Sequence, residues 1–107
     1  MIIYNITANI EASIHQDWLT WIKAHIPKVL ATGKFEKATL AKVLVEEALG
    51  GVTYSIQFRS YSREALDAYY KEDAPRFRSE AQKKFADKML TFRTELEVLD
   101  EYTVNFK

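Results

Sequence analysis

Apolar and polar residues alternate over residues 2–10 of this chain. The apolar positions are Ile2, Tyr4, Ile6, Ala8 and Ile10, and the positions between them are Ile3, Asn5, Thr7 and Asn9. Strict alternation predicts a strand with one buried face. Alternation returns over residues 52–59, where the apolar positions are Val52, Tyr54, Ile56 and Phe58. Residues 35–47 fit either a helix or a strand, and their β-branched residues and position favour a strand.

Helical spacing replaces alternation in residues 14–30. One arc of this segment carries Ile14, Trp18, Trp21, Ile22, His25 and Val29. Ser13 with Gln16 three residues later fits a capping box, and Pro27 predicts a kink or a restarted turn. A second helical region begins after the cap residue Ser62 and ends near Met89. We expect Asp73 and Pro75 to divide it, since aspartate caps a helix and proline suits its first turn.

Alternation appears once more over residues 92–106. Its apolar positions are Phe92, Leu96, Val98, Tyr102, Val104 and Phe106. The predicted order is therefore strand, helix, strand, strand, helix, strand. This is the split βαβ, or ferredoxin-like, arrangement, an α+β fold in which two helices cover one face of a four-stranded antiparallel sheet.

The other face of the predicted sheet is polar. We assign to it Asn5, Thr7, Asn9, Thr53, Ser55, Gln57, Arg59, Arg93, Glu95 and Glu97. Such a face can be solvated, or it can line a cavity. The last strand exceeds the roughly 3–10 residues that strands usually have, which favours pairing with a second copy. Two sheets packed face to face would form a dimeric α+β barrel around the polar face.

Composition narrows the class of protein. A length of 107 residues predicts a single domain over residues 1–107. Fifteen basic and fifteen acidic residues balance, so no net charge attracts nucleic acid or an anionic membrane. The chain has no cysteine, which fits a cytoplasmic protein. Neither a signal peptide nor a run of roughly 18 apolar residues is apparent, so we expect no membrane partner.

Several stretches resemble one bacterial family. They are "IIYNIT", "WLTWIKAHIPKVLATGKF", "GGVTYSIQF" and "APRFRSEAQKKFADKMLTFRTELEVLD". Together they are similar to the family of domain of unknown function 4286 over nearly the whole chain, most specifically in "HIP…ATGKF" and "FRTELEV". The resemblance implies a ferredoxin-like, dimeric-barrel fold. That wider class includes cofactor-free monooxygenases, haem-degrading enzymes, small isomerases and ligand-sensing domains, so it implies no single activity.

His25 is the first candidate for chemistry. A histidine titrates near neutral pH and can act as a general base or a metal ligand. The competing interpretation, which we favour, is a buried histidine bonded to a polar group near Pro27. No second histidine lies at metal-ligand spacing, and we take His15 as a surface group. We therefore predict no metal site and assign no catalytic residue.

Three further residues are candidate ligand-binding groups. Arg59 and Arg93 lie on the predicted cavity face, where two guanidiniums could clamp a carboxylate or phosphate. Ion pairs with Glu95 or Glu97 are the competing interpretation. Asn5 and Trp18 match by type two residues of the haem-degrading proteins, but the second helix lacks their histidine. We therefore expect no haem and no other cofactor.

Three functions follow from these observations. The first is a homodimer that binds a small molecule in a cavity between its sheets. The second is a cofactor-independent enzyme of the monooxygenase or isomerase type, and the third is a protein-interaction domain without a ligand. RNA binding would require exposed aromatic residues on the central strands, where the predicted face instead carries small polar groups.

Overall fold

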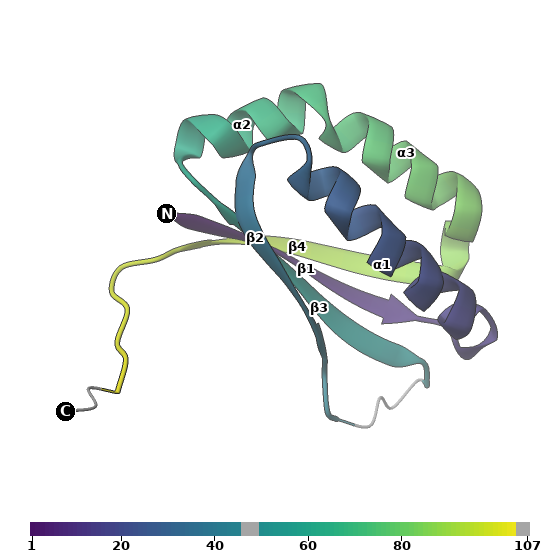
Figure 1. The fold of residues 1–107 in the computed structure, drawn as a ribbon. Coiled ribbons are helices and arrows are strands. Elements are labelled where there is room, and N and C mark those ends of the chain that lie inside the picture. The colour runs from purple at the N-terminus through teal and green to yellow at the C-terminus, as the bar shows by residue number, and fades with distance from the viewer. Residues whose placement is uncertain (46–49, 105–107) are drawn as a thin grey trace.

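The fold is a four-stranded antiparallel sheet with helices packed on one face (Figure 1). The computed structural model describes residues 1–45 and 50–104. Its elements are β1 (Ile2–Ile10), a short 3-10 turn (Ala12–Ile14), α1 (His15–Leu30), β2 (Phe35–Lys42), β3 (Val52–Ser60), α2 (Arg63–Glu72), α3 (Ala74–Phe85), a second 3-10 turn (Ala86–Lys88) and β4 (Met89–Glu97). The predicted α+β, ferredoxin-like class is confirmed, with the second helical region divided into α2 and α3.

The strands lie in the order β2-β3-β1-β4, so the first and third strands are central. Ile6 of β1 lies opposite Ile56 of β3, which places the apolar positions of both strands on one face. The helices cover that face, and the aromatic and aliphatic side chains between the two layers form the core. Its largest fully buried members are Trp18, Tyr4, Phe58, Ile10, Ile56, Leu66 and Val29.

The face assignment of the last strand was wrong. Ile6 lies opposite Arg93 and Thr7 opposite Phe92, so Arg93, Glu95 and Glu97 point toward the helices. Leu90, Phe92 and Leu96 are on the open face instead and are 60%, 61% and 45% exposed. The error arose because alternation shows that two faces differ but not which face the helices cover. Hydrogen bonding to β1 decides that.

The last strand is also displaced along the chain from its predicted position. Met89, expected to end a helix, begins β4, and the strand ends at Glu97 rather than at Phe106. Residues 98–104 continue without secondary structure and lead away from the sheet (Figure 1), while residues 105–106 lie outside the described residues. The predicted strand over 35–47 likewise ends earlier, at Lys42, and residues 46–47 lie outside the described part.

Of three predicted helix caps, the structure confirms one. The Ser62 side chain accepts a hydrogen bond from the Ala65 amide and caps α2 as predicted. Ser13 does not cap α1, because it lies within the preceding 3-10 turn and donates to the Glu11 carboxylate. Asp73 does separate α2 from α3, but its side chain accepts from Lys34 at 3.0 Å rather than capping α3. The helix α1 also continues through Pro27 to Leu30 without a restart.

Candidate functional site

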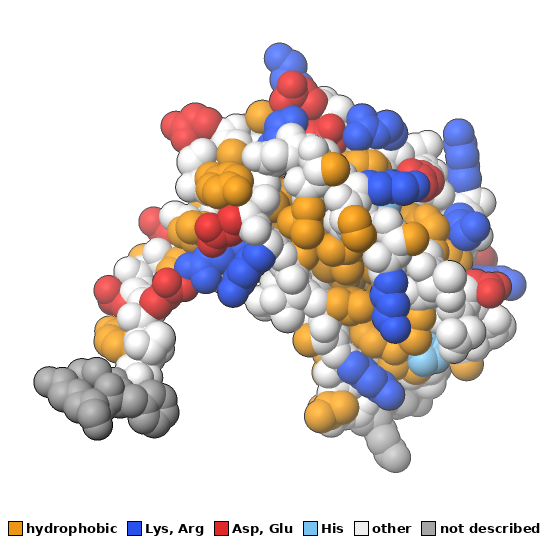
Figure 2. Space-filling model, in the orientation of Figure 1, with side chains coloured by type: hydrophobic (Ala, Val, Ile, Leu, Met, Phe, Trp, Pro, Cys, Tyr) orange, Lys and Arg blue, Asp and Glu red, His pale blue; other side chains and the backbone are white. Residues whose placement is uncertain are grey.

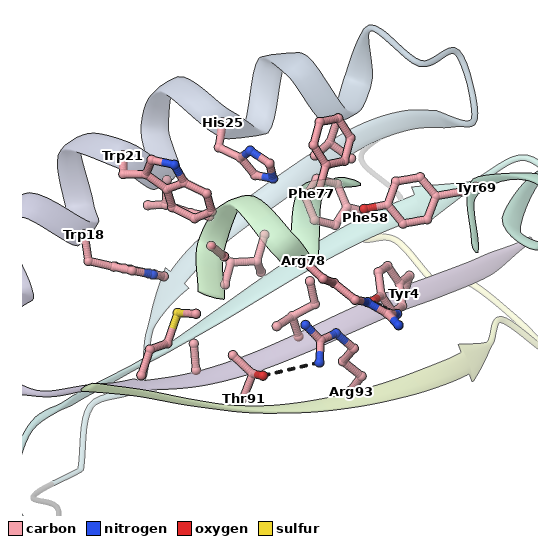
Figure 3. A pocket seen from close by; sticks show the side chains of 17 residues that line it. Tyr4, Trp18, Trp21, His25, Phe58, Tyr69, Phe77, Arg78, Thr91 and Arg93 are labelled. Carbon is pink, nitrogen blue, oxygen red and sulfur yellow. Dashed lines mark hydrogen bonds between the residues drawn. The ribbon is translucent and has the colours of Figure 1, made fainter. Parts of the chain in front are cut away.

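A pocket lies between the helices and the sheet, on the side of β1 that faces α1 and α3 (Figure 3). Its free volume is about 70 Å³. Its walls come from β1, from the strands β3 and β4 on either side of it, and from all three α-helices, and aromatic rings make up much of the lining. The aromatic residues in the lining are Tyr4, Trp18, Trp21, His25, Phe58, Tyr69 and Phe77.

His25 projects from α1 into this ring-lined pocket and is 7% exposed. Its imidazole stacks on Trp21, with ring centroids 4.4 Å apart, and meets Phe77 edge-on at 4.8 Å. The predicted burial is therefore observed, but the predicted polar partner is not. The buried Nδ1 atom has no hydrogen-bond partner among the described residues. The same is true of the Trp18 indole nitrogen, so two polar atoms of the lining are unsatisfied.

Burial lowers the pKa of His25 below its ordinary value, because the apolar rings disfavour the charged imidazolium. Glu80 opposes this shift of the pKa, and Lys28 adds to it. The imidazole is therefore neutral at pH 7 and keeps one nitrogen able to accept a proton or a hydrogen bond. A neutral imidazole in an apolar pocket can bind a polar group of a ligand or act as a base toward it.

Two arginines lie where the pocket opens to solvent. Arg78 comes from α3 and donates to the Tyr4 hydroxyl at 3.1 Å. Arg93 comes from β4 and donates to the Thr91 hydroxyl at 3.3 Å (Figure 3). Both arginines are exposed, whereas the rest of the lining is buried or half-buried. The opening is therefore cationic and the interior apolar.

The four predicted ligand-binding residues fall on both faces of the sheet. His25 and Arg93 share the pocket. Asn5 is on the open face, where it accepts from the Ser55 hydroxyl at 2.8 Å. Arg59 lies on the same open face and is paired with Glu36 at 3.2 Å and with Glu101. The predicted pairing of Arg59 with Arg93 in one clamp was therefore wrong, since the sheet separates them.

Arg78 belongs to the pocket but was absent from the predicted set. It lies three residues before Ala81 and seven before Phe85, the spacing of one helical face. Ala81 also lines the pocket and Phe85 is buried. A single arginine on an otherwise apolar helix face was the available signal.

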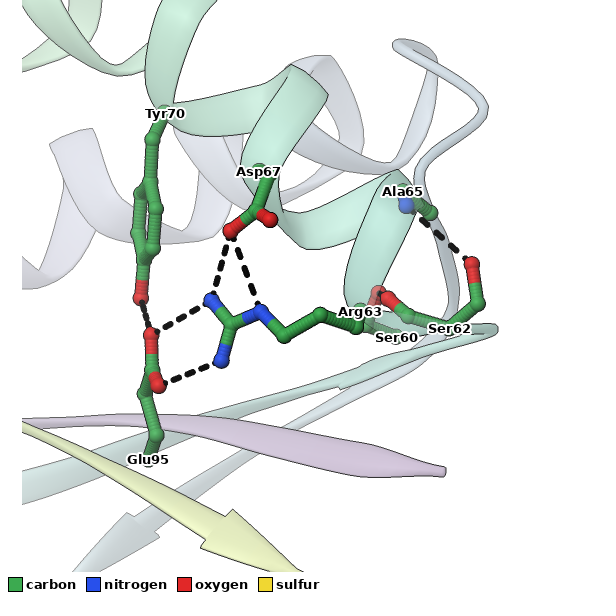
Figure 4. A network of polar contacts seen from close by, with 7 residues as sticks. All are labelled: Ser60, Ser62, Arg63, Ala65, Asp67, Tyr70 and Glu95. Atoms are coloured by element: carbon green, nitrogen blue, oxygen red, sulfur yellow. Dashed lines mark hydrogen bonds and ion pairs between the residues drawn. The ribbon is translucent and has the colours of Figure 1, made fainter.

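A polar network joins α2 to the edge strand β4 outside the pocket (Figure 4). Arg63 contacts both carboxylate oxygens of Glu95, at 2.7 and 3.1 Å, and also bonds Asp67. Tyr70 donates to the same Glu95 carboxylate. The hydrogen bonds from Arg63 and Tyr70 lower the pKa of Glu95 to about 2. The charges of this network are mutually satisfied, which is typical of a structural link.

Residues 1–45 and 50–104 contain no cluster of three or more His, Cys, Asp or Glu side chains that could hold a metal ion. None of the described helices is long and apolar enough to span a membrane.

Comparisons with known proteins identify relatives of the fold. Residues 1–99 match the model of a family described as domain of unknown function DUF4286. No curated protein matches the chain. Several solved structures resemble it, and three of them do so over nearly their whole lengths, at identities that establish the fold alone.

The first of these structures is At3g17210 from Arabidopsis thaliana, with a TM-score of 0.66, 16% identity, and coverage of 94% of this chain and 100% of that one. The second is a dimeric ferredoxin-like protein from an uncultured marine organism, with a TM-score of 0.70, 14% identity, and coverage of 94% and 97%. The third is a Deinococcus radiodurans protein named "putative antibiotic biosynthesis monooxygenase", with a TM-score of 0.62, 16% identity, and coverage of 98% and 99%.

Proposed function

This chain belongs to the DUF4286 family, which has no known function, and we propose that it binds a small, largely apolar molecule in the pocket between its helices and its sheet. One observation carries the proposal: two buried polar atoms of the pocket wall, His25 Nδ1 and Trp18 Nε1, lack hydrogen-bond partners among the described residues. Unsatisfied buried polar atoms are rare because each costs about 1–3 kcal/mol. A ligand with one or two polar atoms would satisfy them.

The size and lining of the pocket agree with a small ligand. Ligand sites are mostly apolar, with a few polar groups that fix orientation, and this pocket has that character. Its free volume of about 70 Å³ is about half of the roughly 150 Å³ of a cavity that holds benzene. A ring would therefore also occupy the part of the pocket that opens to solvent.

Tryptophan emission provides a direct test of binding. Trp18 and Trp21 both line the pocket, and the sequence has no other tryptophan. All tryptophan emission therefore reports on this pocket. We expect a panel of small aromatic compounds to include some that change the emission with saturation. Ala81→Phe should block these changes by filling the pocket, whereas Ala24→Phe, at an exposed position on α1, should not.

If the emission of Ala81→Phe changed and saturated at the same compound concentrations as that of the wild-type protein, binding at this pocket would be contradicted. Circular dichroism of both variants checks that they fold. If no compound in the panel changes the emission of the wild-type protein, the binding proposal fails.

We also propose that two copies associate through the open face of the sheet. Leu90, Phe92 and Leu96 expose a row of apolar side chains there, on an edge strand whose outer backbone groups are unpaired in the sheet. Residues 98–104 and the ends of β2 and β3 project to the same side, which leaves a hollow beneath the sheet (Figures 1 and 2). The dimeric ferredoxin-like neighbour supports this arrangement. A ligand cavity between the two sheets, expected from the sequence, stays a prediction.

Sedimentation velocity tests the association. We expect the wild-type protein to sediment as a dimer and Phe92→Ser to sediment as a monomer. Tyr61→Ser is the matched control, because Tyr61 is 56% exposed but follows β3 rather than lying on β4. If Phe92→Ser and Tyr61→Ser sedimented in the same way, the proposed interface would be contradicted.

A second candidate function is cofactor-independent catalysis, with His25 as the base. The neutral imidazole within the pocket and the monooxygenase name of one neighbour support it. The test is mass spectrometry of a bound compound after incubation in air, which detects added oxygen, together with chromatography, which detects an isomer. His25→Gln should abolish conversion and retain binding. Unchanged compound with the wild-type protein would contradict catalysis but not binding.

A further inference from the structure

The opening of the pocket carries two guanidiniums that come from different parts of the chain. Arg78 lies on α3 and Arg93 on β4, and both line the pocket. Figure 3 shows the two side chains reaching toward the same region beside Tyr4. They are also the exposed members of the lining. A molecule that enters from solvent therefore passes both charges before it reaches the rings.

These two arginines differ from the other arginines of the described chain. Arg59, Arg63 and Arg76 each have a carboxylate within 4.0 Å. In residues 1–45 and 50–104, neither Arg78 nor Arg93 has one, and the groups that accept their hydrogen bonds are the uncharged hydroxyls of Tyr4 and Thr91. Like charges that face one opening repel each other. An anion between them would remove this repulsion.

We propose that Arg78 and Arg93 form an anion subsite, so that the ligand of this pocket is an aromatic carboxylate with its ring inside and its carboxylate at the opening. This inference rests on the proposed function, because it specifies the class of molecule that the same pocket binds. Guanidinium and carboxylate are planar and form two parallel hydrogen bonds, which gives direction as well as charge.

The lining of the pocket suits the ring of such a ligand. It consists largely of ring faces and edges, and ring pairs prefer the offset and edge-on contacts already present among Trp21, His25 and Phe77. A molecule with a ring at one end and a carboxylate at the other would match the apolar interior and the cationic opening. An uncharged ring would match only the interior.

The Tyr69 hydroxyl lies near both charges. Burial raises the pKa of Tyr69, and the nearby Tyr4 raises this pKa further. The charges of Arg78 and Arg93 both oppose that rise in pKa, so both guanidiniums lie close enough to one buried phenol to influence it.

The test compares benzoate with benzamide, which have the same size and ring but differ in charge. Binding is measured by titration of the tryptophan emission. We expect benzoate to bind the wild-type protein about tenfold or more tightly than benzamide does, since hydrogen bonds between charged partners are about twice as strong as neutral ones. Arg93→Gln should reduce the affinity for benzoate about tenfold and leave that for benzamide unchanged.

Two further variants control for net charge and for folding. Lys84→Gln removes one positive charge from the exposed last turn of α3, outside the pocket lining, and should leave both affinities unchanged. Arg78→Gln should act like Arg93→Gln. Circular dichroism confirms that each variant is folded before titration.

The outcomes distinguish a failure of the anion subsite from a failure of binding in the pocket. Equal affinities for benzoate and benzamide, or an unchanged affinity for benzoate in Arg93→Gln, would overturn the anion subsite and leave a pocket for uncharged rings. A loss of benzoate binding in Lys84→Gln equal to that in Arg93→Gln would overturn it too, since net charge alone would then explain the preference. If neither compound changes the emission of the wild-type protein, this inference fails, and the panel of small aromatic compounds described above decides whether the pocket binds at all.

Discussion

Replacement of His25 by leucine is expected to stabilise the folded protein below pH 6.5. The imidazole is 7% exposed and its Nδ1 atom has no hydrogen-bond partner among the described residues. The folded state therefore loses the hydration of a polar atom without replacing it. Leucine has no such atom and suits the apolar rings around this position.

Two opposing contributions set the size of the effect. Removal of an unsatisfied buried polar atom stabilises by about 1–3 kcal/mol. Each of the two lost ring contacts, with Trp21 at 4.4 Å and with Phe77 at 4.8 Å, costs about 0.5–1.5 kcal/mol, so together they cost about 1–3 kcal/mol. The two contributions nearly cancel, so the free energy of unfolding should be almost unchanged at pH 7.5.

A gain in stability should appear as the pH falls. In the unfolded chain His25 titrates near 6.5, whereas burial lowers its pKa in the folded state. Between those two pKa values the unfolded chain binds a proton that the folded protein does not, so the wild-type protein loses stability as the pH falls below 6.5. The leucine variant has no proton to bind at this position. The difference in free energy of unfolding should therefore be larger at pH 5.5 than at pH 7.5.

Urea denaturation at both pH values, at one fixed protein concentration, measures these differences. His15→Leu is the contrasting variant, because His15 Nε2 shares a hydrogen bond of 2.6 Å with the buried Tyr54 hydroxyl. It should destabilise by about 1 kcal/mol, since the tyrosine loses its partner. If His25→Leu destabilised the protein as much as His15→Leu does, the Nδ1 atom would not be an unsatisfied group and the reasoning would be refuted.

Three further predictions concern the backbone and the α2–β4 link. Ala86 has φ +47°, a conformation that glycine adopts more easily, so Ala86→Gly should raise the Tm. The control Ala24→Gly, in the exposed middle of α1, should instead lower the free energy of unfolding by about 1 kcal/mol. Gly51→Ala should lower the Tm more than Gly33→Ala does, because both have φ +80° but only the Cβ at Gly51 would meet the Ile10 carbonyl oxygen, at 2.8 Å. Glu95 has a pKa of about 2 in the folded protein, so its contribution to stability is complete above pH 4.5 and is lost as the pH falls toward 2. The difference in Tm between the wild type and Glu95→Gln should therefore shrink over that range. A constant difference in Tm would exclude the ion pair as its source.

Much of the fold was predictable because its signals are local. Alternation over residues 2–10 and 52–59 depends on the pleat of single strands, and the cap residue Ser62 depends on one turn of helix. The ends of elements were less predictable. The apolar residues after Glu97 continue an alternating pattern, but up to residue 104 the chain has no strand there, since a strand also requires a partner to pair with.

The candidate site was predictable only in part. His25 was a candidate because a histidine on an apolar helix face is itself unusual. Arg93 was a candidate for a different reason, its assignment to the open face, and that assignment was wrong. Arg78 was not predicted, because nothing near it in the sequence shows that α3 and β4 line the same pocket.

The sequence by itself determined the strand and helix order, the neutral charge and the apolar faces of the central strands, because each depends on composition or on the repeat of one element. Tertiary structure alone decided which face of β4 the helices cover and which residues surround one pocket. These depend on pairing between residues such as Ile6 and Arg93, which are distant in the sequence and have no local pattern in common. The same pairing puts Arg59 and Arg93 on opposite sides of the sheet and brings Arg93 to the opening that Arg78 also lines.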